Sequence, residues 1–162
     1  MRNLKMIAAG LAAIAGLAMA STAQAQTLKD QLVGSWSAVS NTEEYADGAK
    51  TPWGPDVKGT LIIEANGQFA LEIGVGDRAK PAGNPAENPV GKFIAYFGSY
   101  GVDEASKTIS FKIVRSSFPG WDGTEQKRVV TEIGDQMTFK SAAPIPSGKG
   151  PFTPVVVWSR VK

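Results

Sequence analysis

The feature that most constrains the fold of this sequence is the close spacing of its turn signals, which leaves no room for a long helix. Pairs such as Asn66-Gly67 and Gly134-Asp135 separate short segments in which apolar and polar residues alternate. Asn-Gly suits the positive φ angles of a type I′ turn, so residues 59–65 and 68–75 are predicted to form a tight β-hairpin. The chain is therefore expected to be built from hairpins.

The same reasoning extends along the chain and predicts strands at 34–41, 59–65, 68–75, 93–102, 108–115, 125–133, 136–141 and 154–161. Residues 27–33 are expected to form one helical turn. Loops are expected at 45–55, 76–91, 116–123 and 142–151, with 76–91 a candidate lid. Phe69, Leu71 and Ile73 share one face of their strand, and Gln68, Ala70 and Glu72 share the other.

About eight sequential strands without crossover helices predict an all-β fold of antiparallel strands. A single eight-stranded up-and-down β-barrel is favoured over a sandwich, because closure removes exposed strand edges. An eight-stranded barrel has an interior that side chains fill or that holds one small ligand.

Residues 1–25 have the order of a secretory signal peptide. Arg2 and Lys5 precede the apolar run Met6–Ala20, and Ala23-Gln24-Ala25 provides a small-residue cleavage site. We therefore expect cleavage after Ala25, a mature domain of residues 26–162, and a periplasmic or secreted location. The signal holds two of the 17 basic residues and none of the 15 acidic ones, so the mature domain is close to neutral.

Composition excludes several classes of function. The 162 residues include no Cys and no His, which excludes cysteine chemistry, His-based catalytic triads and zinc sites built from these ligands. A neutral domain lacks the electrostatic footprint expected for nucleic acid or anionic membranes. No apolar run after the signal approaches the roughly 20 residues of a membrane span. No motif predicts a catalytic residue, a metal site or a cofactor.

Two motifs near the ends of the domain resemble the lipocalin and calycin proteins. Gly34-Ser35-Trp36 lies on the first predicted strand and Trp158-Ser159-Arg160 on the last. The resemblance implies that the tryptophan of Gly-x-Trp closes the barrel floor and that a late arginine packs on it. We expect Trp36 and Arg160 to form this pair, although Trp158 shares a strand face with Arg160 and is an alternative partner.

The chain is more closely similar to the bacterial and fungal lipocalin-like domain family. The similar stretches occur in order along the domain: Leu32–Trp36, Pro52–Pro55, Gly59–Ile62, Asn66-Gly67, Ala95–Tyr100, Val102-Asp103, Phe118–Trp121 and Gln126–Arg128. This resemblance implies a small β-barrel able to hold an apolar ligand. Members often carry His on the strand that matches 108–115, where this chain has none, so no His-dependent activity is carried over.

Aromatic residues provide the first candidates for a ligand site. Tyr96, Tyr100, Trp121 and Trp53 are suited to a cavity wall, since each offers a flat apolar face and one hydrogen-bonding atom. Tyr96 and Tyr100 are four residues apart, so they point to the same side of a strand, and Phe97 points to the other. The alternative is that these aromatic side chains simply fill a small barrel.

Arg115 is the most informative charged residue, because it continues the alternation of Ile109, Phe111 and Ile113 toward the interior. A buried arginine needs a partner, which Glu72, Glu64 or the carboxylate of an amphipathic ligand would provide. The alternative is a bulge that turns Arg115 into solvent. The candidate ligand-binding residues are Arg115, Tyr96, Tyr100, Trp121, Trp53 and Glu72.

Three functions remain open at this point. The first is an exported protein that binds a small apolar or amphipathic molecule, for which we expect a cavity of several hundred Å³. The second is an isomerase or cyclase that uses groups other than His, for which a carboxylate should face Tyr96 or Tyr100. The third is a filled barrel that acts on another envelope protein through an exposed apolar patch of several hundred Å², which is expected around Trp53 and Trp121. The ligand and the oligomeric state are not determined by the sequence.

Overall fold

The computed structural model describes residues 26–78, 80, 83 and 91–162. A short helix, α1 (Leu28–Leu32), leads into nine antiparallel strands and a 3₁₀ turn, η1 (Pro119–Trp121). The strands are β1 (Gly34–Tyr45), β2 (Lys50–Pro52), β3 (Lys58–Ile63), β4 (Gln68–Gly74), β5 (Phe93–Asp103), β6 (Thr108–Ser116), β7 (Glu125–Ile133), β8 (Gln136–Ser141) and β9 (Phe152–Arg160).

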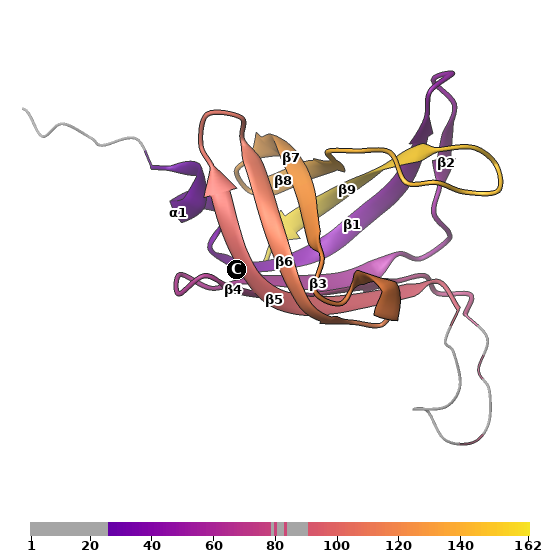
Figure 1. Cartoon of the computed structure of the whole chain (residues 1–162), viewed down its shortest axis with the longest axis horizontal. Helices are drawn as coiled ribbons and strands as arrows, with labels where there is room; N and C mark the ends of the chain where they lie inside the picture. Colours follow the sequence, from indigo (N-terminus) through magenta and orange to yellow (C-terminus); the bar gives the residue numbers. More distant parts are fainter. Residues whose placement is uncertain (1–25, 79, 81–82, 84–90) are drawn as a thin grey trace, which may run out of the picture.

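Eight of these strands form a closed barrel (Figure 1). From β3 to β9 each strand pairs with the next, and β1 pairs with both β3 and β9, so that no barrel strand has a free edge along its whole length. The short β2 lies outside this ring and pairs only with residues 42–44 of β1. The predicted all-β barrel is confirmed, and the sandwich alternative is excluded.

The predicted strands are present, with two local corrections. Residues 45–55 were expected to form a loop, but they contain β2, because the Asp47-Gly48 turn folds Lys50–Pro52 back onto the end of β1. In the β3–β4 hairpin only Gly67 of the Asn66-Gly67 pair has positive φ, so the turn is not type I′. The turn is longer, and the Glu64 amide donates to the Gln68 carbonyl at its base. Residues 79, 81–82 and 84–90 of the expected lid lie outside the described residues.

One end of the barrel is closed by α1 and by the strand ends beside it (Figure 1). Thr27 caps α1, Glu104 accepts hydrogen bonds from the Leu28 and Lys29 amides at 2.7 and 3.0 Å, and Leu32 is fully buried. The predicted pair is present here, because the Arg160 guanidinium stacks on the Trp36 ring. Trp36 also donates from Nε1 to the Leu32 carbonyl at 3.0 Å.

Two of the three β-bulges, those in β1 and β6, decide which candidate side chains enter the barrel, and the third lies in β7 between Val130 and Glu132. In β1 the pairing with β9 shifts between Ala38 and Ser40, so Val39 is extruded and Asn41 becomes buried. In β6 the pairing with β5 shifts opposite Gly98, so that Arg115 pairs with Phe97 on the outer face. Each bulge adds one residue to its strand. Beyond the bulge, the positions that the alternation would turn into the barrel therefore point outward, and the others point inward.

Candidate ligand-binding cavity

An interior cavity of about 160 Å³ lies in the barrel on the side of the core away from α1. Its walls come from several strands, with Leu71 and Ile73 on β4, Ile94 on β5, Phe139 on β8 and Val156 on β9. These residues face inward because they follow the alternation of their strands. The interior is therefore not completely filled, but the cavity is smaller than the several hundred Å³ expected.

Aromatic rings form one wall of this cavity. Tyr96 meets Trp121 edge to face, with ring centroids 5.8 Å apart and an interplanar angle of 85°. Phe118 meets the other side of Trp121 at 5.8 Å. The η1 turn brings Trp121 to Tyr96, because Pro119 begins the turn and the Trp121 amide donates to the Phe118 carbonyl. Aromatic pairs in this geometry are favourable beyond their buried area, so the wall is well defined.

Arg128 lies inside the barrel among these apolar side chains. It is 5% exposed and lines the cavity from β7. Its Nη1 atom donates to the Lys127 carbonyl at 3.0 Å and to Ser141 Oγ at 3.5 Å. In the described part of the chain no carboxylate oxygen lies within 4.0 Å of its guanidinium. The cavity thus contains a buried positive charge that no described carboxylate pairs.

Two further polar side chains line the cavity without hydrogen bonds to other described residues. Asn41 is 8% exposed and its Oδ1 atom has no partner, and the fully buried Trp158 has an unpaired Nε1. Most buried polar groups in proteins are hydrogen-bonded, and an unsatisfied one costs roughly 1–3 kcal/mol. In the described part of the chain, the arginine of this cavity has no carboxylate partner, the amide oxygen has no donor and the indole N–H has no acceptor. Such a cavity is suited to a polar ligand.

The Tyr96 hydroxyl belongs to the same polar group. Burial raises the pKa of Tyr96 above its ordinary value of 10.0, and the nearby Arg128 guanidinium opposes that rise. Tyr96 therefore stays neutral at physiological pH, where its hydroxyl can donate or accept a hydrogen bond. It does not neutralise the charge of Arg128.

Three predicted site residues lie in the cavity wall, namely Tyr96, Trp121 and Trp53. Tyr96 is buried and Phe97 is exposed, as their positions on one strand predicted. Tyr100 is also buried, but it does not line the cavity, and its hydroxyl donates to the Glu64 carbonyl at 2.9 Å. Tyr100 is thus part of the core of the barrel.

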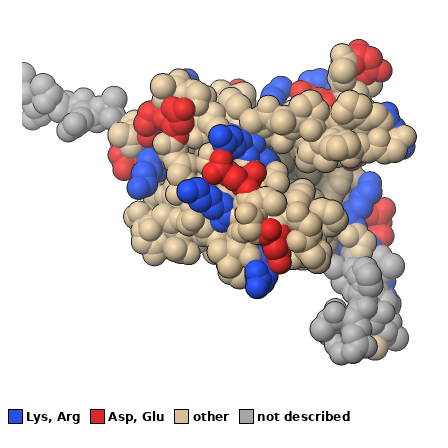
Figure 2. All heavy atoms as spheres, viewed as in Figure 1, with Lys and Arg blue, Asp and Glu red and all other residues tan. Residues whose placement is uncertain are grey.

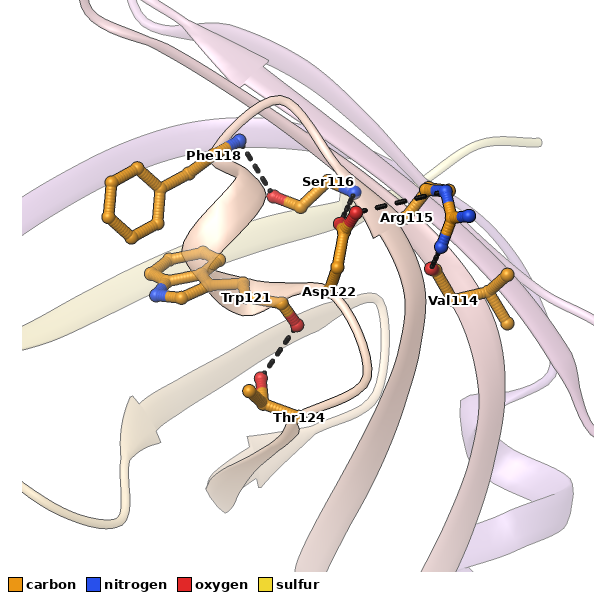
Figure 3. A network of polar contacts seen from close by, with 7 residues as sticks. All are labelled: Val114, Arg115, Ser116, Phe118, Trp121, Asp122 and Thr124. Atoms are coloured by element: carbon orange, nitrogen blue, oxygen red, sulfur yellow. Dashed lines mark hydrogen bonds and ion pairs between the residues drawn. The ribbon is translucent and has the colours of Figure 1, made fainter.

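Arg115 and Glu72 lie on the outer face of the barrel. The bulge in β6 turns Arg115 outward, which is the alternative placement that its sequence position left open, and its side chain is 71% exposed. Figure 3 shows Arg115 on the side of the loop away from Phe118 and Trp121, with Asp122 between them. Arg115 Nε lies 3.7 Å from Asp122 Oδ2, and Asp122 also accepts from the Ser116 amide at 2.8 Å. Glu72 alternates with the buried Leu71 and Ile73 and is therefore exposed.

Arg128, Asn41 and Trp158 were not predicted as site residues. A signal was available for Arg128, which shares the inward face of β7 with Val130. Trp158 shares the inward face of β9 with Val156. Asn41 could not be placed by alternation, because only the bulge at Val39 turns it inward.

Charged side chains on the described surface are candidates for a site besides the cavity. On the face seen in Figure 2, basic and acidic side chains are interspersed, as expected for a near-neutral domain. Within the described ranges no group of three Asp or Glu residues is arranged to hold a metal ion. Neither of the described helices, of five and three residues, is able to cross a membrane.

The sequence of residues 33–161 matches the protein family described as Lipocalin-like domain. The match extends from the residue before β1 to the residue after β9 and so includes the whole closed barrel. The chain belongs to the lipocalin-like domain family. A comparison with curated proteins found no match. Membership in the lipocalin-like family agrees with a barrel whose interior holds a small molecule.

Proposed function

We propose that this chain is an exported binding protein that takes a small apolar or amphipathic molecule into its barrel. The observation that carries the proposal is the cavity of about 160 Å³, in which apolar walls surround polar side chains that lack partners. Ligand pockets are typically apolar with a few placed polar groups, and this cavity has both parts. The family supports the same function, because small barrels of this type have room for one ligand.

The size of the cavity limits the ligand. An engineered protein cavity of about 150 Å³ holds one benzene molecule, so 160 Å³ suits a single ring or a short branched chain. A long acyl chain would need a wider barrel than the one described. The proposed ligand is therefore small, with an apolar body of one ring or about five to seven carbons.

The other two hypotheses receive less support from the same geometry. The enzyme hypothesis expected a carboxylate opposite Tyr96, but no Asp or Glu is among the described residues that line the cavity. The filled-barrel hypothesis expected an exposed patch around Trp53 and Trp121, but both side chains are partly buried against the core. We therefore favour binding over both alternatives.

Native mass spectrometry tests the proposal on protein that is purified from its exported form without detergent. We expect an additional mass that leaves on denaturation, or, if the ligand is lost in purification, uptake of added toluene as a probe. A mature mass that starts at Gln26 would support export and cleavage of the signal.

Matched variants locate the ligand in these experiments. Val156→Phe adds a ring to the cavity wall and should prevent binding, whereas Val114→Phe adds the same ring at a site that is 54% exposed and should not. If neither the native ligand nor toluene binds to the wild-type protein, the proposed function is wrong. Equal binding by both variants would also contradict a site in this cavity.

A further inference from the structure

We propose that the cavity recognises the carboxylate of a small monocarboxylic acid through Arg128, with Trp158 and Tyr96 as additional hydrogen-bond donors. This inference rests on the proposed function and specifies its ligand class. It replaces Arg115, which was considered for this role from sequence, with an arginine that lies inside the barrel.

Arg128 carries its charge inside the barrel. A guanidinium stays protonated in proteins, so a side chain that is 5% exposed brings a full positive charge into the barrel. The usual solution is a buried carboxylate, and an uncompensated internal charge is strongly unfavourable. Its described partners are a backbone carbonyl, a serine hydroxyl and the nearby Tyr96 hydroxyl, all of them neutral. An anionic ligand would supply the missing partner.

The groups around Arg128 favour a ligand that accepts hydrogen bonds over one that donates them. Trp158 Nε1 is an unpaired N–H that can only donate, and Arg128 has further N–H groups besides Nη1. The neutral Tyr96 hydroxyl can donate as well. A carboxylate offers about four acceptor positions and suits the planar fork of an arginine. Asn41 also lines the cavity; its unpaired Oδ1 is an acceptor, and the residue donates to the carboxylate only with the NH2 group of its amide turned toward the ligand.

The apolar walls and the small volume define the rest of the ligand. Leu71, Ile73, Phe139 and Val156 provide no hydrogen bonds from their side chains and so suit a ring or a branched chain. The 160 Å³ must contain both this body and the carboxylate. The chemistry that fits is therefore an aromatic or short branched monocarboxylate, for which benzoate is a suitable probe.

The test compares benzoate with its neutral isostere benzamide by isothermal titration calorimetry of the mature protein at neutral pH. Because a hydrogen-bonded charge pair is formed only with benzoate, we expect benzoate to bind at least about tenfold more tightly. Arg128→Met should remove this preference, whereas Arg115→Met, which removes the same charge from the outer face, should leave it unchanged.

A second variant keeps the test valid if Arg128→Met fails to fold. Trp158→Phe removes the unpaired N–H and part of the buried ring but keeps an aromatic side chain in the core. We expect it to weaken benzoate binding several-fold, whereas toluene, which needs no donor and gains space, should bind at least as tightly as in the wild type. Equal affinity for benzoate and benzamide in the wild-type protein would overturn the inference and leave the proposed function standing. Failure of benzoate, benzamide and toluene alike would overturn the proposed function itself.

Discussion

The guanidinium carbon of Arg160 lies 4.1 Å from the centre of the Trp36 ring and joins the last barrel strand to the first. The same side chain donates to two carbonyls of the segment that precedes β1, those of Val33, at 3.0 Å, and Gln31. Three interactions of one side chain thus hold the closed end of the barrel, away from the cavity.

Replacement of Arg160 should therefore destabilise the barrel without direct loss of the ligand site. We expect Arg160→Met to lower the free energy of unfolding by about 2–4 kcal/mol, from the lost stacking and the two lost hydrogen bonds. Urea unfolding followed by tryptophan fluorescence measures this change. The control is Arg115→Met, for which the exposed position predicts a change of less than about 0.5 kcal/mol. Similar losses in both variants would contradict the assigned role of Arg160.

Gly98 makes the bulge in β6 possible. A Cβ atom at this position would overlap the Lys112 carbonyl oxygen on the neighbouring strand. Gly98→Ala must shift the backbone of β5 or β6, so we expect it to destabilise the protein by about 2 kcal/mol or more.

Gly101 provides a matched control on the same strand, since a Cβ there would meet no atom within 4 Å. Gly101→Ala should change the free energy of unfolding by less than about 1 kcal/mol in thermal or urea denaturation. A Gly98→Ala protein as stable as the wild type would show that the two strands approach less closely at the bulge.

Asn41 is expected to reduce stability in the absence of ligand. Its buried Oδ1 has no hydrogen-bond partner among the described residues, and leucine has nearly the same shape without polar atoms. Asn41→Leu should therefore raise the free energy of unfolding by about 1–2 kcal/mol, because an unsatisfied buried group is removed. Benzoate affinity should fall in the same variant. A less stable Asn41→Leu protein would indicate that the amide is satisfied by ordered water.

Tyrosine ionisation should limit stability at high pH. Burial raises the pKa of Tyr96 above 10.0 in the folded protein, whereas the unfolded chain titrates near the ordinary value. Tyr96 therefore keeps its proton to a higher pH in the folded state than in the unfolded chain. Its contribution to the free energy of unfolding is complete below pH about 10 and is lost as pH rises further.

Urea unfolding across this pH range measures the effect, and ultraviolet difference spectra follow the ionised phenol. Tyr96→Phe should make the decline at high pH shallower, although burial also raises the pKa of Tyr100 and leaves part of it. An unchanged slope in Tyr96→Phe would place the titrating group elsewhere.

The sequence predicted the strands and the closed barrel because local alternation and turn residues determine both. It predicted the positions of Tyr96 and Phe97 for the same reason, since no bulge intervenes in the pairing of β4 with β5. The pair of Trp36 and Arg160 was expected from the resemblance to the lipocalins, and it is present. It also predicted that Trp121 and Trp53 lie near Tyr96, from their aromatic character alone.

The polar part of the site was harder to predict, because two bulges reverse the alternation of their strands. One bulge places Asn41 inside the barrel, and the other places Arg115 outside it. The alternation in β6 suggested that Arg115 faces inward, although the isolated Gly98 on the partner strand is a known sign of a bulge. Nothing in the sequence beside Val39 marks the bulge that buries Asn41. Arg128 lies two residues before Val130 on β7, and the alternation rule places both on the inward face, so its position could have been predicted.

The pairing of β1 with β9 has a consequence for the order in which the protein folds. Its register joins Trp36 to Arg160 and Tyr45 to Phe152, so the two strands that meet are the most distant of the barrel along the chain. Hairpins such as β3–β4 form from neighbouring residues, whereas this seam requires the closure of a loop of more than one hundred residues. The cavity acquires its last wall, with Val156 and Trp158, only when the seam closes. Ligand binding is therefore a property of the completed chain, and a small acid that binds there would stabilise the closed barrel over forms in which this seam is open.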